Sequence, residues 1–256
     1  MVINKTRIYI MGCPIDNLTM NETIALVEDY IKQRKLCQHV VVNAAKLVDI
    51  RKDPQLRKII SDCDIINADG MPIVWASRIL GNPLPCRVAG VDLFQELVKV
   101  CAIKGYRPFF FGAREEVVTK VVDVLKQRYP DLAVAGYRNG YYSAEEEQLI
   151  AEQIRSSKAD MLFVGFSSPQ KEKFLNTWMP TMQVSFCMGV GGSFDIVAGR
   201  TKRAPTWMQN IGFEWLYRLV QEPGRMWKRY ATTNPVFIWM VLSEFLKQKI
   251  MGNSSV

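Results

Sequence analysis

Short apolar runs alternate with amphipathic segments over the first 200 residues of the chain. The runs lie at 7–12, 39–43, 64–70, 108–111, 160–166 and 185–195. Between them, apolar residues recur every three or four positions, so the pattern predicts strands that alternate with helices. Because the strand runs are continuously apolar, we expect a mostly parallel, doubly wound α/β sheet with helices on both faces.

Some helix ends can be predicted from single residues. Thr19 or Asn21 is suited to cap a helix that runs to Lys35, because a side-chain oxygen there accepts a hydrogen bond from a first-turn N–H. Pro54 predicts a break in a helical segment, and Gly105 predicts the end of another helix. The first 200 residues therefore read as one continuous α/β domain.

The pattern changes after about residue 204 to a helical, aromatic and basic segment. This segment holds four of the six tryptophans, Trp207, Trp215, Trp227 and Trp239. We therefore expect an α/β domain over 1–200 and a C-terminal appendage over 201–256.

Most of the net positive charge lies in the same C-terminal part. The formal net charge is +8, and residues 200–250 hold nine Lys and Arg against three Glu. A basic surface of this kind favours an anionic partner, which is nucleic acid, a phosphorylated ligand or an anionic membrane. Apolar residues at 48% and charged residues at 23% are ordinary for a globular chain and exclude disorder and coiled coil.

Cysteine and histidine usage argues against a metal or disulfide scaffold. The six cysteines are scattered without a C-x-x-C pair, and His39 is the single histidine, so we expect no zinc site and a reducing, cytosolic environment. The apolar run near the start is too short for a signal peptide. The run 235–242 is far shorter than the ~20 residues that span a bilayer, so we expect no membrane crossing.

Polar residues follow five of the predicted strands. They are Asn43, Asp69, the stretch 112–114, the stretch 167–172 and Asp195. In an open α/β sheet, ligands bind at the carboxyl ends of the strands. We therefore expect these groups to form one site that contains a carboxylate, an amide and backbone donors.

Two readings of Asp69 remain open on spacing alone. An Asp-Gly step is a common turn and helix-cap dipeptide, whereas a carboxylate at a strand end can also act as a general base. Asp62 and Asp64 have a spacing that can hold a divalent cation, but they precede a strand and lie at the wrong edge of the sheet. We expect them to be structural.

Glycine-rich turns offer a weaker signal for phosphate binding. Gly112 and the turn Gly189–Gly192 could let backbone N–H groups approach an anion, or could serve packing alone. Neither turn matches the dinucleotide or P-loop motif, which disfavours a nicotinamide oxidoreductase.

The basic, aromatic C-terminal segment has three readings. It could bind nucleic acid by stacking and neutralisation, bind the headgroup layer of a membrane, or be a solvated surface. We favour the membrane. Arg218 and Arg225 are seven residues apart, which aligns them only on an unbroken helix, and Pro223-Gly224 lies between them.

Five sequence blocks carry a family resemblance. They are PIDNLT (14–19), NADGMPIVWASRILGNPLPCRVAGVDL (67–93), FFFGA (109–113), VGFSSPQKEKF (164–174) and GVGGSFDIVAGRTKRAPTWMQNIGFEWLYRLVQEPGRMWKRY (189–230). In this order, over nearly the whole chain, they resemble the WecG/TagA/CpsF glycosyltransferases, glycosyltransferase family 26.

The resemblance implies a Rossmann-like, inverting, metal-independent enzyme without a cofactor. It implies transfer of N-acetylmannosamine or a related hexose from a UDP-sugar to a polyprenyl-diphosphate-linked saccharide in bacterial cell-surface polysaccharide synthesis. UDP-glucose and UDP-uronic acids stay open as donors. It also implies a cytoplasmic protein bound peripherally to the inner face of the membrane, with no nucleic-acid partner and with homo-oligomers left open.

Family positions can be transferred to this sequence one by one. The resemblance makes Asp69 the catalytic base and Arg87, in P-x-R-V-A-G, a substrate-binding residue. Asn43 matches the strand-end asparagine of a T-P-N motif, but Val41 and Val42 precede it here, which leaves the sugar specificity open.

The remaining binding residues come from the later blocks. The family's P-K-Q-E is P-Q-K-E here, so either Gln170 or Lys171 faces the ligand. Asp195 is implied as a uridine or ribose contact, and Arg218 and Arg225 as contacts of the leaving diphosphate. Gly112 and Gly191 complete the expected binding residues.

The alternative to this transferase is a nucleic-acid-binding or scaffold protein with a degenerate nucleotide-binding fold. In that case the basic, aromatic segment would account for most of the binding, with a steep dependence on salt.

Overall fold

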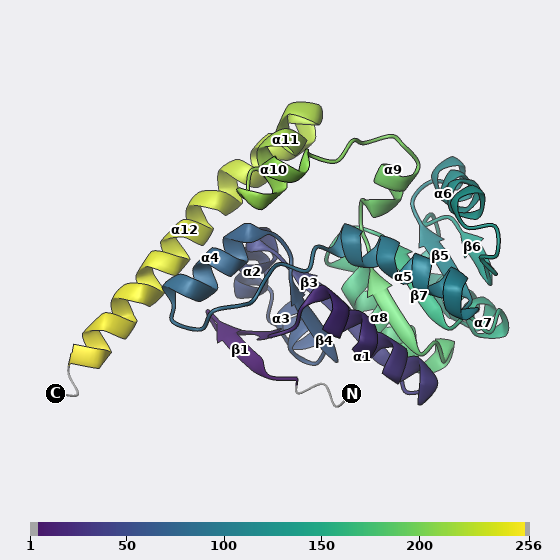
Figure 1. The fold of residues 1–256 in the computed structure, drawn as a ribbon, viewed down its shortest axis with the longest axis horizontal. Helices are drawn as coiled ribbons and strands as arrows, with labels where there is room; N and C mark the ends of the chain where they lie inside the picture. The colour runs from purple at the N-terminus through teal and green to yellow at the C-terminus, as the bar shows by residue number, and fades with distance from the viewer. Residues whose placement is uncertain (1–4, 254–256) are drawn as a thin grey trace.

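A six-stranded parallel sheet forms the centre of the molecule. The computed structural model describes residues 5–253 (Figure 1). The strands of this sheet are β3 (Cys37–Val42), β4 (Ile65–Ala68), β5 (Pro108–Gly112), β6 (Gly136–Arg138), β7 (Met161–Gly165) and β8 (Phe186–Gly189). Their order is β4-β3-β8-β7-β5-β6. Each neighbouring pair is parallel, which confirms the predicted α/β class.

Helices cover both faces of the sheet, as a doubly wound fold requires. One layer contains α1 (Met20–Lys32), α5 (Gly90–Lys104), α6 (Glu115–Arg128) and α9 (Ser193–Val197), which share a buried cluster with Phe110 and Phe163 of the sheet. The other layer contains α2 (Ala44–Lys52), α3 (Pro54–Ser61), α7 (Glu147–Ser156) and α8 (Gln170–Met182). A 3₁₀ turn at Ala144–Glu146 leads into α7.

The strand order places a switch point between β3 and β8. The helix after β3 is α2 and the helix after β8 is α9, and these two helices lie on opposite faces of the sheet. Chains that leave adjacent strands toward opposite faces open a crevice at the carboxyl ends, which is the usual ligand site of such sheets. We use the term crevice for the carboxyl edge of the sheet between β3 and β8, where these adjacent parallel strands lead into Asn43 and into the turn Gly189–Gly192.

The amino-terminal segment forms a hairpin that the sequence pattern did not predict. Strand β1 (Arg7–Ile10) pairs antiparallel with β2 (Cys13–Asp16). Thr19 caps α1 in a capping box with Glu22, which confirms one of the two expected caps. The helix ends at Lys32 rather than Lys35, because the chain reverses there and Arg34 has a positive φ of 52°.

Three helices follow the sheet in the C-terminal segment, α10 (Thr206–Asn210), α11 (Glu214–Gln221) and α12 (Pro223–Asn253). The chain bends between α11 and α12 at Glu222, so Arg218 and Arg225 lie on different helices. Helix α12 runs along α2 and α4 (Met71–Ile79), and Phe237, Met240 and Val241 pack into the same apolar cluster as α2 (Figure 1). Within residues 5–253, no helix combines the length and apolar content needed to cross a bilayer.

Candidate active site

Asn43 and Asp69 follow the neighbouring strands β3 and β4 at the carboxyl edge of the sheet. The Asn43 side chain caps α2 by accepting a hydrogen bond from the N–H of Lys46 at 3.0 Å. Helix α4 begins after Gly70, with no side-chain cap on its first turn, so the cap reading of Asp69 is wrong. The Asp69 carboxylate instead acts electrostatically on Lys171, Arg203 and Glu214.

The glycines at the strand ends have definite packing reasons. A Cβ atom on Gly112, whose φ is +133°, would lie 2.7 Å from the backbone of Gly165 on the adjacent strand. Gly191 has a φ of +53° and lies beside the Lys171 ammonium. These contacts explain why glycine is needed there, and a role for either residue in binding a phosphate stays a prediction.

Of the exchanged pair at the start of α8, Lys171 is the one that points into the crevice. Its alkyl chain crosses Gly189, where a Cβ would lie 2.7 Å from Lys171 Cδ, whereas Gln170 is exposed. Burial and, to a smaller extent, the nearby ammonium of Lys46 lower the pKa of Lys171 to about 8, against the opposing effect of Glu172 and Asp69. A lysine in this setting can gain or lose its proton near neutral pH.

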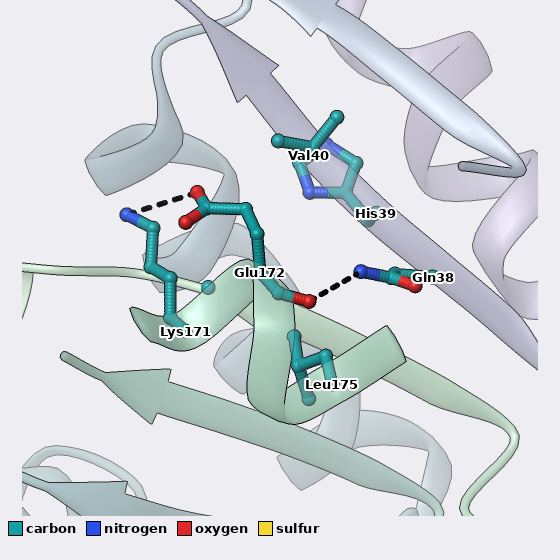
Figure 2. Close-up of a pocket in the computed structure, with 7 residues that line it drawn as sticks. Gln38, His39, Val40, Lys171, Glu172 and Leu175 are labelled. Carbon is teal, nitrogen blue, oxygen red and sulfur yellow. Dashed lines mark hydrogen bonds and ion pairs between the residues drawn. The ribbon is translucent and has the colours of Figure 1, made fainter. Parts of the chain in front are cut away.

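Lys46 and Glu172 form an ion pair beneath Lys171. The Lys46 Nζ lies 2.6 Å from Glu172 Oε1, and the Lys171 Nζ lies 3.9 Å from the same oxygen. Figure 2 shows the Lys171 and Glu172 side chains meeting above the Glu172 backbone, whose carbonyl accepts from Gln38. Burial alone would raise the pKa of Glu172, but the two ammonium groups outweigh it and hold that pKa below its usual value.

A second set of charges joins the C-terminal segment to α5. Arg203 binds both oxygens of Asp92, with 2.8 Å between Nη2 and Oδ2, and its Nε lies 3.5 Å from Glu214 Oε1. Arg87 donates to Gln209 at 2.8 Å and lies 3.8 Å from Asp92. We call Arg87, Asp92, Arg203, Gln209 and Glu214 the C-terminal contact network.

Arg218 lies at the Gly-rich turn after β8. Its Nη2 would be 3.4 Å from a Cβ on Gly192, and Asp195 Oδ2 would be 4.0 Å from the same point. Arg203, Glu214 and Arg218 also line one small depression. Burial, reinforced by the Asp69 carboxylate, raises the pKa of Glu214. The side chain of Arg225 is outside the described part of the structure.

Asp62 and Asp64 lie at the amino edge, as expected. Asp62 is the C-cap residue of α3, and Asp64 accepts a hydrogen bond from the N–H of Gln38 at 2.8 Å. Within the part of the chain that the structure describes, no cluster of His, Cys, Asp or Glu has the arrangement of a metal site. Asp62 and Asp64 thus have structural contacts at this edge, and the absence of a metal role for them stays a prediction.

Sequence reasoning missed Lys46, Asp92 and the pairing of Arg203. A signal for Lys46 was present, because it lies three residues after the strand-end Asn43 and so falls in the first turn of α2 at the same edge. Asp92 and Arg203 are 111 residues apart, and nothing in the local pattern connects them.

The switch-point crevice, the strand-end carboxylate of Asp69 and the surrounding lysine and arginine side chains define a Rossmann-like protein with a site suited to an anionic ligand. The model of the family described as "Glycosyl transferase WecG/TagA/CpsF family" matches residues 8–251. The chain belongs to this glycosyltransferase family.

Named relatives span most of the chain. A Bacillus subtilis (strain 168) protein named N-acetylglucosaminyldiphosphoundecaprenol N-acetyl-beta-D-mannosaminyltransferase is 34% identical over 235 residues, 90% of each chain. A protein of the same name from Bacillus spizizenii is 33% identical over 83% of this chain and 81% of its own. Another from Staphylococcus aureus (strain MW2) is 30% identical over 96% of each chain.

Proposed function

We propose that this protein is an inverting glycosyltransferase that moves N-acetylmannosamine from a UDP-sugar to a polyprenyl-diphosphate-linked N-acetylglucosamine. The observation that supports the proposal is that Asp69 directly follows β4 at the carboxyl edge of the sheet, where its charge acts on Lys171 and Arg203. The acceptor and the sugar follow the names of the relatives in Bacillus and Staphylococcus.

Asp69 is the general base in this proposal. Its carboxylate takes the proton of the acceptor hydroxyl as that oxygen attacks the anomeric carbon, and the bond to the UDP oxygen breaks on the opposite face. The transition state has oxocarbenium character, and the leaving diphosphate takes the electron pair of the broken bond. Atoms and charge balance without an oxidant or a metal ion.

Cationic side chains stabilise the charge that develops on the diphosphate. Arg218 lies at the Gly189–Gly192 turn and Lys171 lies over it, and Arg225 follows on α12. Fixed donors of this kind act most strongly in a site from which water is excluded. The proposed binding residues are Asn43, Arg87, Gly112, Gln170, Lys171, Gly191, Asp195, Arg218 and Arg225.

We also propose that the appendage, residues 201–256, binds the inner face of the cytoplasmic membrane. Trp239, Leu242 and Leu246 are 66%, 50% and 56% exposed and share one face of α12, opposite the face buried against α2. An apolar stripe next to basic residues is typical of a helix in the headgroup layer. Lipid-linked acceptors would reach the crevice from that layer.

The decisive experiment is transfer by the purified protein with defined substrates. UDP-N-acetylmannosamine and a short polyprenyl-diphosphate N-acetylglucosamine should give a disaccharide lipid and free UDP, with inverted anomeric configuration by NMR and with no loss in EDTA. Asp69→Asn should lower turnover about a hundredfold to ten-thousandfold, the range for losing a general base.

Asp62→Asn is the matched control, because Asp62 is an exposed aspartate at the opposite edge of the sheet. Near-normal turnover of Asp69→Asn would overturn its role as base. If UDP-N-acetylmannosamine gives no product but UDP-glucose or a UDP-uronic acid does, the proposed donor sugar is wrong.

A vesicle-binding assay tests the appendage. Replacing Trp239, Leu242 and Leu246 by serine should release the protein from vesicles that contain anionic lipid and leave the buried face of α12 intact. Unchanged binding would overturn this face as the anchor. The substitution is preferable to truncation, because α12 contributes Phe237 and Met240 to the apolar cluster.

A further inference from the structure

The Lys46–Glu172 ion pair is buried inside the core, where charge is costly. Lys46 is 5% exposed and Glu172 is 2% exposed, yet their side chains approach to 2.6 Å. The second oxygen of Glu172 has no hydrogen-bond partner among the described residues. Desolvation of two charges offsets most or all of their attraction, so a buried pair of this kind is weak evidence for stability.

The pair connects the core to a residue at the crevice. Lys46 is on α2, Glu172 is on α8, and the adjacent Lys171 extends from the same turn of α8 across Gly189. The ammonium groups of Lys46 and Lys171 both lie near the Glu172 carboxylate, so this cluster of three side chains carries one excess positive charge. Lys171 is the more distant of the two lysines from that carboxylate. The Lys171 side chain is only 12% exposed, so the surrounding residues restrict it to few conformations.

Charged and titratable groups face Lys171 from several elements. They are Lys46 on α2, Glu172 on α8, Asp69 after β4, Arg229 on α12 and His39 on β3. His39 is fully buried with its pKa lowered to about 4 by burial, so it is neutral at physiological pH. Asp69 and Glu172 are the two carboxylates that act on the Lys171 ammonium.

We propose that Lys46 and Glu172 are positioning residues, which hold the Lys171 ammonium over the Gly189–Gly191 turn between Asp69 and the leaving diphosphate. This inference rests on the proposed transferase activity. Glu172 anchors Lys171 by charge, and Lys46 fixes the Glu172 carboxylate in the one orientation that serves both lysines. The positioned ammonium stabilises the negative charge of the reacting groups only while it carries its proton.

An activity limit at alkaline pH follows from this arrangement. The pKa of Lys171 is about 8, so turnover should decline as the pH rises through that value. Removing the Glu172 carboxylate takes away an attraction and leaves the repulsion of Lys46, which moves the decline to lower pH. If Glu172 had a purely structural role, its removal would not change the pH at which turnover declines.

The experiment compares Glu172→Gln with the double variant Lys46→Met/Glu172→Leu. The double variant removes both charges and keeps the volume, so it is expected to fold as stably as the wild type. Glu172→Gln should lower kcat about a hundredfold, the scale for misplacing a group by about 1 Å, and shift the alkaline limb below pH 8. The double variant should recover stability without recovering kcat.

Lys173→Met is the matched control, because it removes a lysine from the same helix that is not part of the cluster. Recovery of kcat in the double variant, or an alkaline limb that Glu172→Gln does not move, would overturn the proposal.

A second readout is independent of transferase activity. In protein labelled with ¹³C-lysine, the Lys171 Cε signal, assigned by its loss in Lys171→Arg, should titrate near pH 8 and at lower pH in Glu172→Gln. If the wild type shows no transfer, the proposed function fails, and an unshifted Lys171 titration would separately overturn the positioning of Lys171 by Glu172.

Discussion

Two groups of charged residues surround the crevice, and they differ in how deeply they are buried. The side chains of Lys46 and Glu172 are 6% and 3% exposed. In the C-terminal contact network, the Arg203 side chain is 17% exposed and its partners Asp92 and Glu214 are 34% and 37% exposed. The first group joins elements of the sheet core, and the second joins α5 to the segment that precedes and forms α11.

Burial decides what each group can contribute. Charges removed from water interact strongly with one another, so the loss of one partner leaves an uncompensated charge in the core. Charges at a half-exposed contact are screened by water and salt, so they form and separate at little cost. The core group therefore suits a fixed catalytic geometry, and the C-terminal contact network suits a segment that docks on the domain.

The largest difference between the buried Lys46–Glu172 pair and the C-terminal contact network is expected in the free energy of unfolding. Lys46→Met should destabilise the protein by about 3–5 kcal/mol, because it leaves Glu172 buried without its close partner. The double variant Lys46→Met/Glu172→Leu should return close to the wild-type value. Urea denaturation followed by circular dichroism measures both. A loss below about 1 kcal/mol for Lys46→Met would remove the distinction between the two groups.

Arginine substitutions at the crevice should affect turnover without a matching loss of stability. Arg218→Ala or Arg225→Ala should lower kcat about tenfold to a thousandfold if these side chains stabilise the leaving diphosphate. Arg51→Ala, an exposed arginine on α2, is the control. Steady-state kinetics and a melting curve on the same samples separate the two effects, and a melting shift without a kinetic change would make Arg218 structural.

Breaking the C-terminal contact network should have a small, salt-dependent effect. Arg203→Met should cost about 0.2–1 kcal/mol at low salt and less in 1 M salt, because Asp92 and Glu214 are partly exposed. Limited proteolysis should cut the variant faster between residues 198 and 206. Equal cleavage of wild type and variant would show that Arg203 does not hold this segment in place.

The smallest effects are expected in the pH dependence of folding stability. Glu172 and Glu214 should contribute to this dependence with opposite signs. The pKa of Glu172 is lowered from 4.5, so its contribution to stability is present above pH 4.5 and is lost as the pH falls through its folded-state pKa. The pKa of Glu214 is raised from 4.5, chiefly by burial, so the folded state gains stability from its protonation as the pH falls toward 4.5.

Glu214→Gln tests this sign directly. The variant should lose the part of the pH dependence of unfolding that lies just above pH 4.5 and should keep the acid destabilisation that Glu172 causes. Denaturation curves at several pH values measure both limbs. A variant with the wild-type pH dependence would show that Glu214 is not the group responsible.

Much of the fold followed from local pattern. Apolar runs predicted five of the six parallel strands, whereas the run at 7–12 forms β1 of the antiparallel hairpin. Thr19, Pro54 and Gly105 marked helix ends that the structure confirms. The hairpin strand β2 was missed, because Cys13–Asp16 is short, contains a proline, and is buried against β4 by contacts that a local pattern does not encode.

The candidate site was predictable only in part. The strand-end position of Asn43 and Asp69 could be read from sequence, since each directly follows an apolar run. The sequence could not predict that Lys171, rather than Gln170, points toward the Gly189 turn, because this depends on which side of α8 faces β8. Lys46 and Glu172 are separated by 126 residues, and Arg203 and Asp92 by 111, so their pairing required the packed structure.

The sequence by itself therefore determined the alternation of strands and helices, the basic C-terminal segment and the strand ends that bear polar groups, since these depend on residues close together in the chain. The tertiary structure decided the strand order, the crevice between β3 and β8, and the partner of each buried charge. Those features arise when distant segments exclude water from between them, because only then do interactions between charges become strong enough to fix their positions.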